Sequence, residues 1–178
     1  PNVREIAKKC EKFIHGNPSG IDVNQVLSDT PLLFSKKEGA SELDFDLNSY
    51  LLIIDTGVVG ITKETLKHIE DNYVEYEKYI TELGEITDSV IEPLKNKNID
   101  LVGQYMYKAH DLLRKLGVSH ASNDEVVEIC KNNNAVGAKL TGGGAGGCCI
   151  SLSKTKENAL EIQNALKEKG YSSWIVTV

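Results

Sequence analysis

A cluster of glycines separates two β-type segments near the end of the chain. Five of the six residues from 142 to 147 are glycine, and the apolar run Cys148–Leu152 follows at once. A connection this short between residues 136–140 and that run favours an antiparallel hairpin. Three of the glycines also satisfy the spacing G-x-G-x-x-G, but a dinucleotide-binding loop must open a helix, and this one runs into a strand. We therefore predict a hairpin and reject a dinucleotide fold.

Two functions fit the glycine cluster. Glycine permits backbone conformations that are closed to other residues, and it lets a phosphate or a second chain approach the main chain closely. Glycine clusters also often mark nothing more than a turn. The loop is therefore either a ligand-facing element or the flexible tip of a hairpin, and its composition alone does not decide between them.

Helical and extended patterns alternate along the chain. Residues 3–14 carry apolar side chains at spacings of three and four, which predicts a helix that buries one face. Ser122 followed by Glu125 has the form of a capping box and predicts the start of another helix. The other predicted segments are strands at 31–35, 50–55 and 173–178, a short helix after Thr62, two pairing helices at 72–94 and 102–116, and a helix at 155–169. Strands interleaved with helices indicate an α+β fold.

A polar, acidic stretch from Lys36 to Asn48 is the best candidate for a domain boundary. It lacks the apolar alternation of the strands on either side. We therefore predict the end of one domain at residues 1–46 and a second domain at residues 47–178. The chain begins at Pro1 and enters helical periodicity at once, which we interpret as a start within a longer protein.

The composition narrows the class of protein. Hydrophobic residues make up 40% of the chain and charged residues 26%, which is typical of a soluble globular protein. No apolar run approaches the roughly 18 residues that a membrane helix requires, so we expect no membrane association. The net charge of -6 repels a nucleic-acid backbone, so we also expect no nucleic-acid partner.

The four cysteines favour reduced thiols. They are Cys10, Cys130, Cys148 and Cys149, and none belongs to the paired C-x-x-C or H-x-x-x-H patterns of a zinc site. Cys148 and Cys149 stand in an apolar run, where buried cysteine usually acts as a small hydrophobic residue. We therefore expect free thiols and a cytoplasmic protein.

Two acidic residues, Glu11 and Asp22, lie on either side of a tight turn at Pro18–Gly20. In kinases of small alcohols, one carboxylate positions the acceptor hydroxyl or accepts its proton, and another completes the oxygen shell of Mg²⁺. The alternative is structural, with Glu11 in a surface ion pair and Asp22 capping the following segment, since exposed acids are common. By residue type alone, His15 is more often a hydrogen-bonding spacer than a base.

Three segments resemble the GHMP kinase superfamily. His15–Asp22 reads H-G-N-P-S-G-I-D and looks like the H-G-x-P-S-G-x-D signature of mevalonate kinases. Lys139–Cys148 resembles the third, glycine-rich motif of the superfamily, and Leu116–Ser122 is similar to the L-G-V-x-H segment that precedes it. Because their order and separation also match, the resemblance spans nearly the whole chain. It implies a ferredoxin-like α+β C-terminal domain of the superfamily, with an antiparallel sheet backed by helices, preceded by a remnant of the N-terminal domain.

The resemblance implies a reaction and the residues that perform it. The reaction is the phosphorylation of the C5 hydroxyl of mevalonate by ATP, with Mg²⁺ as cofactor. Asp22 corresponds to the catalytic aspartate that faces this hydroxyl, and Glu11 to the glutamate that helps bind Mg²⁺. The residues implied to contact the substrate are His15, Ser19, Gly20 and Thr56. Those implied on the nucleotide side are Gly142, Gly143, Gly144, Ala145 and Gly146, in a loop that packs against the nucleotide phosphate loop and shapes the cleft.

The chain departs from the family pattern in two respects. Mevalonate kinases often read G-A-G-G-G-G where this chain has alanine at position 145, and the added methyl restricts the turn. The family's phosphate-binding loop, P-x-x-x-G-L-G-S-S-A, belongs to an N-terminal half that this sequence lacks. We therefore expect the N-terminal half of the same protein as a partner, and no kinase activity from this chain alone. A homodimer is left open.

Two alternatives stay open. Another GHMP kinase, such as a phosphomevalonate kinase or a galactokinase-like enzyme, would share these motifs and differ in its acceptor alcohol. A non-catalytic binding or regulatory module would keep the fold and lose phosphoryl transfer, although pure binding would not require both acids.

Overall fold

The computed structural model describes residues 2–15, 19–60 and 62–178 of the chain. The chain divides into two compact units, Pro1–Phe45 and Asp46–Val178. The assignment of residues 1–46 to the end of an N-terminal domain, and of residues 47–178 to a C-terminal domain, stays a prediction.

The first unit holds two helices and a hairpin. They are α1 (Val3–His15), α2 (Ile21–Val26), β1 (Leu32–Ser35) and β2 (Gly39–Glu42). The two strands pair antiparallel, and α2 contacts both α1 and β1. Sequence patterns missed α2 and β2, and β2 lies within the stretch interpreted as a polar connection. Every residue of β2 is exposed and α2 buries none, so neither element leaves an apolar pattern in the sequence.

The second unit is an antiparallel sheet with helices. Its elements are β3 (Tyr50–Asp55), α3 (Thr62–Asp71), α4 (Tyr73–Lys95), α5 (Ile99–Lys115), α6 (Ala121–Asn132), β4 (Gly137–Leu140), β5 (Cys148–Ser153), α7 (Lys156–Glu168) and β6 (Ser172–Thr177). The strand order is β4-β5-β3-β6, and each neighbouring pair is antiparallel. This is the ferredoxin-like α+β arrangement, so the predicted fold class and the predicted β4–β5 hairpin are confirmed.

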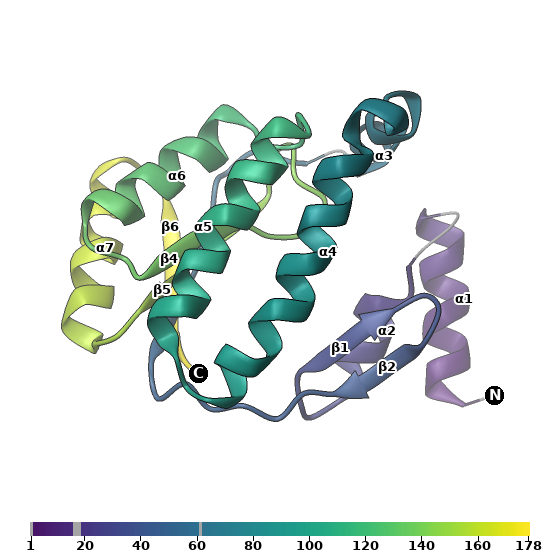
Figure 1. Cartoon of the computed structure of the whole chain (residues 1–178), viewed down its shortest axis with the longest axis horizontal. Coiled ribbons are helices and arrows are strands. Elements are labelled where there is room, and N and C mark those ends of the chain that lie inside the picture. The colour runs from purple at the N-terminus through teal and green to yellow at the C-terminus, as the bar shows by residue number, and fades with distance from the viewer. Residues whose placement is uncertain (1, 16–18, 61) are drawn as a thin grey trace. The chain divides into compact units, whose positions relative to one another are not determined.

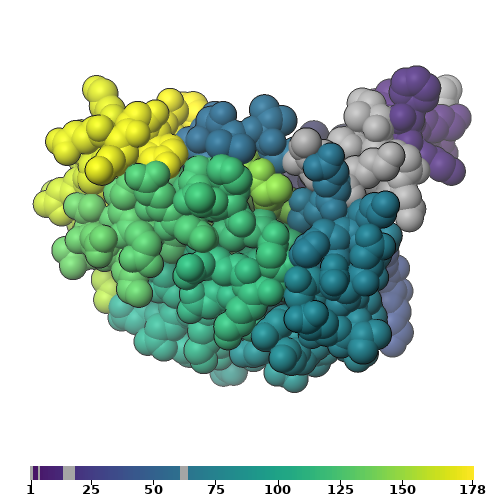
Figure 2. Space-filling model, turned by 90° about the horizontal axis from the view of Figure 1, so that it is seen from above, coloured from purple at the N-terminus to yellow at the C-terminus, as the bar shows by residue number. Residues whose placement is uncertain are grey.

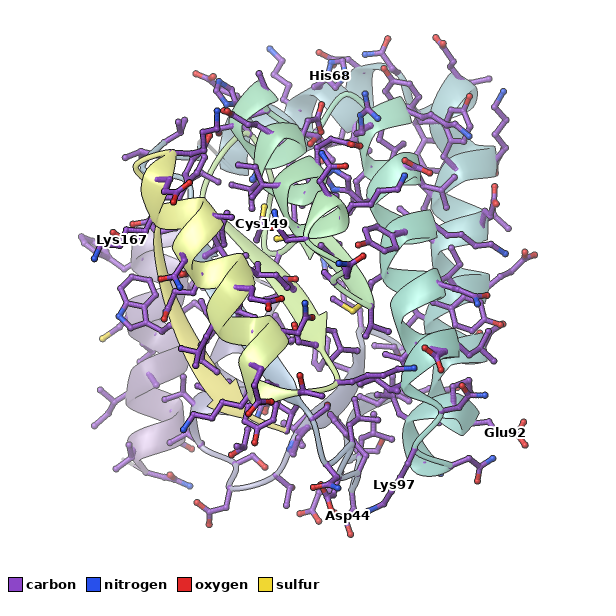
Figure 3. All side chains as sticks on the ribbon, turned by 90° about the vertical axis from the view of Figure 1, so that its left-hand side faces the viewer. Asp44, His68, Glu92, Lys97, Cys149 and Lys167 are labelled. Carbon is purple, nitrogen blue, oxygen red and sulfur yellow. The ribbon has the colours of Figure 1, made fainter. Side chains whose placement is uncertain are left out.

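The core of the second unit lies between the sheet and three helices. Figure 1 shows α5, α6 and α7 over the sheet, while α4 packs against α5. The predicted pairing of the helices at 72–94 and 102–116 is therefore confirmed. Cys149, labelled in Figure 3, lies in this interior, far from surface side chains such as Lys167. The fully buried apolar side chains are Leu52, Ile54, Val126, Cys130, Ala138, Leu140, Cys149, Leu152, Ala159, Ile162 and Leu166.

Helix α5 lies against the edge strand β4 because two glycines face each other. A Cβ atom on Gly103 would overlap the carbonyl oxygen of Val136, and one on Gly137 would overlap Gly103. Glycine alone allows two backbones to approach this closely. The contact fixes α5 beside the strand that leads into the glycine loop.

The start of α6 differs from the sequence prediction. The helix begins at Ala121 and its N-cap is His120, whose Nδ1 accepts a hydrogen bond from the Ser122 backbone N–H at 3.1 Å. The reciprocal capping-box partner is Asn123. The predicted capping box of Ser122 and Glu125 is therefore wrong, because a histidine two residues earlier already caps the helix. Glu125 instead accepts a hydrogen bond from the Tyr171 hydroxyl at 2.7 Å.

No helix in the described part of the chain, residues 2–15, 19–60 and 62–178, has the length and apolar character needed to cross a membrane.

Candidate functional site

The glycine loop that joins β4 to β5 adopts a backbone path that few residues tolerate. Gly142, Gly144, Gly146 and Gly147 all have positive φ, and so does Ala145, at 57°. An L-residue in this left-handed region costs about 1–2 kcal/mol. Ala145 therefore carries strain, as expected from the departure of this position from the glycine pattern of the family.

Two of the loop glycines are required by close packing. Gly144 and Gly146 are buried. A Cβ atom on Gly144 would overlap the carbonyl oxygen of Val118, and one on Gly146 would lie 2.7 Å from that of Val58. The loop is therefore packed against two neighbouring segments, and it is not a free hairpin tip. Figure 2 shows part of it, in yellow-green, at the surface between the blue segment that follows β3 and the green helices.

Backbone hydrogen bonds tie the loop to the same two segments. The Ala145 N–H donates to the carbonyl of Val118, and the Gly147 N–H donates to that of Val58, both at 2.7 Å. The carbonyl of Gly147 accepts the N–H of Thr56 at 3.1 Å and its hydroxyl at 2.6 Å. The loop thus bridges the α5–α6 connection and the segment after β3.

Asn123, on the first turn of α6, completes the bracing from inside. It has no exposed surface. Its Oδ1 accepts the N–H of Gly146 at 3.0 Å, and its Nδ2 donates to the carbonyl of Gly146 at 3.0 Å. Sequence reasoning missed this residue. The only available signal was its position three residues after His120, which a histidine N-cap makes hard to recognise.

The hydrogen bonds to Val118, Val58 and Asn123 determine which N–H groups of the loop can face a ligand. The N–H groups of Ala145, Gly146 and Gly147 are all bonded within the unit, so they are not free to bind a phosphate. Gly142 and Gly143 are exposed, and within the described part of the chain their N–H groups have no hydrogen-bond partner. The loop is therefore built as a rigid wall with an exposed tip. Nucleotide contact by Gly142, Gly143, Gly144, Ala145 and Gly146 stays a prediction.

Thr56 is buried beside this loop, with 7% of its surface exposed. Its hydroxyl donates to Gly147, as described above, and also lies 3.4 Å from the Val58 N–H. In this structure Thr56 holds the segment after β3 against the glycine loop. Its predicted contact with the substrate stays a prediction.

A second set of side chains caps the edge of β4 where the loop begins. The Leu140 N–H donates to His110 Nδ1 at 3.4 Å, and Lys139 Nζ donates to the Leu140 carbonyl at 2.7 Å. Because Nδ1 accepts, the neutral imidazole carries its proton on Nε2. Burial lowers the pKa of both His110 and Lys139, since each charged form loses its hydration.

Asp124 links this edge to the surface. One of its carboxylate oxygens lies 3.2 Å from Nε2 of His110 and accepts the Ser119 hydroxyl at 2.6 Å. The other lies 3.2 Å from Nε of Arg114. Asp124, Arg114 and Ser119 border an open depression of about 440 Å³, which Asp111 and Lys115 also line. Its walls carry both signs of charge, so it favours no ionic ligand.

The predicted catalytic acids lie in the first unit. Glu11 is on α1 and partly buried, and Asp22 is exposed in the first turn of α2. The two helices contact each other. Within the described part of the chain, neither carboxylate has a hydrogen bond or an ion pair. Their roles stay predictions.

The rest of the predicted catalytic segment is only partly described. The side chain of His15 and residues 16–18 lie outside the described residues. Gly20 has a φ of 84° and precedes α2 as its N-cap, and the hydroxyl of Ser19 accepts the N–H of Ile21 at 3.3 Å. Substrate contact by His15, Ser19 and Gly20 stays a prediction.

The carboxylates of Glu11 and Asp22 are of the ligand type that Mg²⁺ prefers. This ion is usually held by one or two protein carboxylates together with substrate phosphates and water. Glu11 and Asp22, both without a neutralising partner among the described residues, could supply those oxygens. Over residues 2–15, 19–60 and 62–178, no group of three or more His, Cys, Asp or Glu side chains could hold a metal ion by itself.

Comparison with known proteins gives a consistent result. Residues 90–172 match the family model described as GHMP kinases C terminal. The chain is 32% identical to the mevalonate kinase of Aeropyrum pernix over 85% of this chain and 48% of that protein. It is 31% identical to the mevalonate kinase of Pyrococcus furiosus over 98% of this chain and 54% of that protein.

A solved structure resembles the whole fold. The mevalonate kinase of L. major in complex with R-mevalonate is similar with a TM-score of 0.84 and 25% identity, over 94% of this chain and 55% of that one. The chain therefore spans about half the length of the relatives it matches.

Proposed function

We propose that the parent protein of this chain, whose residues 90–172 match the family model described as GHMP kinases C terminal, phosphorylates the C5 hydroxyl of mevalonate with ATP. The observation that carries the proposal is Asp22, an exposed carboxylate without a partner among the described residues, at the end of the segment that resembles the mevalonate kinase signature. Support comes from relatives named mevalonate kinase, which are similar over most of this chain.

Each acid has a distinct role in the proposal. Asp22 orients the acceptor hydroxyl and accepts its proton as the oxygen attacks the γ-phosphorus, since an exposed carboxylate can accept a hydrogen bond from that hydroxyl. Glu11 provides an oxygen ligand for Mg²⁺. When bound, Mg²⁺ neutralises charge on the phosphate oxygens.

The glycine loop contributes shape to the proposed cleft. The N–H groups of Ala145, Gly146 and Gly147 already donate hydrogen bonds within the second unit. The loop therefore cannot bind phosphate with them in the manner of a P-loop. It supplies a fixed wall that excludes water from the nucleotide side, and the loop that cradles the phosphates comes from the N-terminal half of the parent protein. A kinase needs both, because the transfer depends on positioning and on neutralising the triphosphate.

The test uses the full-length parent protein and compares Asp22→Asn with Asp29→Asn, a change at an exposed acid of the same unit. We expect Asp22→Asn to lower kcat by about 10²- to 10⁴-fold, the usual contribution of a positioned acid or base, while mevalonate binding changes little. Asp29→Asn should keep wild-type turnover. ADP release measured with a coupled assay gives kcat, and calorimetry gives the affinity for mevalonate.

Two results would overturn the proposal. A wild-type parent protein that turns over ATP with another alcohol and ignores mevalonate would point to a different GHMP kinase. An Asp22→Asn protein that keeps full turnover would remove the assigned catalytic role.

A further inference from the structure

We propose that Asn123 is a positioning residue for the phosphoryl transfer, because it holds the turn Ala145–Gly147 in the one conformation that can shape the nucleotide cleft. The inference rests on the proposed function. It concerns a residue outside every recognised motif of the chain, on a helix that contributes no predicted catalytic group.

The side-chain amide of Asn123 matches the backbone of Gly146. Both hydrogen-bonding groups of Gly146 are satisfied by the side-chain amide of Asn123, each at 3.0 Å. A planar amide with an acceptor on one side and a donor on the other imitates the edge of a neighbouring strand. The amides of Asn and Gln offer a donor and an acceptor on the same carbon, and Gln is longer by one methylene. Asn123 thus fixes the position and the orientation of Gly146 together.

The side chain of Asn123 is itself held in one orientation. Its Oδ1 also accepts the His120 N–H at 3.1 Å, and its Nδ2 lies 3.4 Å from Cys149 Sγ. A flipped amide would place a donor against the two N–H groups, which excludes that orientation. The side chain is therefore held by α6 and by β5, and it transmits their rigidity to the loop.

The conformation of the glycine loop costs backbone entropy and strain. Glycines lose more backbone freedom on ordering than other residues, and Ala145 is additionally strained at a φ of 57°. Without specific bonds, such a loop would sample many paths. The Ala145 N–H bond to Val118 holds one end of the turn, and Asn123 holds its centre.

A simpler role for Asn123 would be that of a helix cap alone. A capping residue in the first turn requires only the bond to the His120 N–H, and such side chains usually lie at the surface. Asn123 is instead fully buried, and both of its amide atoms contact the loop. Capping accounts for one of its hydrogen bonds and leaves the two bonds to Gly146 unexplained.

The experiment uses the full-length parent protein with Asn123→Leu, which keeps the bulk and removes the bonds, and Asn132→Leu as a control at an exposed asparagine of the same helix. Loss of the two bonds should speed amide hydrogen exchange at residues 145–147 by about tenfold, with α5 unchanged. It should also raise KM for ATP by about tenfold while KM for mevalonate stays within about twofold.

A rescue separates positioning from general stability. Adding Ala145→Gly to Asn123→Leu removes the strain, so KM for ATP should recover by at least about threefold. A merely structural role would reduce the active fraction, and hence kcat, without this change in KM. If Asn123→Leu proves poorly folded, Asn123→Asp, which keeps the acceptor and loses the donor, takes its place in the same measurements.

The outcomes are distinct. Unchanged exchange at residues 145–147, or an unchanged KM for ATP, in Asn123→Leu and Asn123→Asp would overturn the inference. If the wild-type protein shows no turnover with mevalonate, the proposed function fails, and hydrogen exchange still decides whether Asn123 holds the loop.

Discussion

The two units of the chain differ in how they are held together. Every buried apolar side chain of the described residues lies in the second unit, and none lies before Leu47. In the first unit, Phe13 is 91% exposed and Val26 is 83% exposed. The unit with the glycine loop thus has its own core, whereas the unit with Glu11 and Asp22 has apolar faces that remain uncovered. The predicted catalytic acids and the glycine loop are therefore carried by parts of different intrinsic stability.

The largest expected effect comes from separating the units. Residues 46–178 should unfold in a single cooperative transition, because the sheet and three helices share one core. Residues 1–45 alone should be largely unfolded, since a segment of this length without buried apolar residues cannot offset its conformational entropy. Circular dichroism with increasing urea measures both. A cooperatively folded peptide 1–45 would contradict the comparison.

Truncation of one apolar side chain in each unit sharpens the contrast. Ile162→Ala removes a fully buried side chain from α7, and should lower the free energy of unfolding by about 3 kcal/mol. Phe13→Ala removes a larger but exposed side chain, and should change it by less than about 0.5 kcal/mol. Urea unfolding of the chain followed by far-ultraviolet circular dichroism, which reports on the helices of both units, gives both values. Equal losses would show that the first unit has a core of its own.

A pair of glycines in neighbouring helices tests the close approach within the second unit. Gly103→Ala in α5 would force a methyl into the backbone of Val136, and should destabilise the chain by about 2 kcal/mol. Gly84→Ala in α4 meets nothing within 4 Å, so the better helix propensity of alanine should stabilise by about 0.5–1 kcal/mol. Thermal unfolding should therefore shift in opposite directions. A shift in the same direction would refute the packing argument.

The sequence predicted the elements that bury an apolar pattern. The strands Tyr50–Asp55 and Cys148–Ser153 and the paired helices α4 and α5 each present a periodic face to the core, and periodicity is a local property of the sequence. The glycine cluster also predicted its hairpin, because the length of a connection limits how its strands can pair. These features could be found without knowledge of tertiary contacts.

The missed features depend on contacts between distant residues. Asn123 and Gly146 meet only after α6 and the hairpin have packed, and nothing in their sequence separation indicates this contact. The pattern of Ser122 and Glu125 did not predict the N-cap at His120, because several polar residues near a helix start compete for the same N–H groups. Within the candidate site, the acids Glu11 and Asp22 were identified by resemblance to a family signature, and their environment could not be inferred from composition.

The smallest expected effect is a pH dependence that originates in the second unit. His110 faces Asp124 on α6, Asp111 and Arg114 on its own helix, and the Leu140 N–H on β4. Burial, the largest cause, lowers the pKa of His110 below its usual 6.5, although the nearby aspartates oppose this shift. The unfolded chain therefore takes up a proton first as the pH falls below about 6.5. Neutral His110 thus contributes stability that is present above that pH and is lost as the pH falls toward the folded-state pKa.

His110→Asn keeps an acceptor near the Nδ1 position without a titrating group. The urea midpoint of this variant should therefore fall less between about pH 7.5 and about pH 5.5 than that of the wild type. An equal fall in both proteins would mean that the acid sensitivity arises elsewhere in the chain.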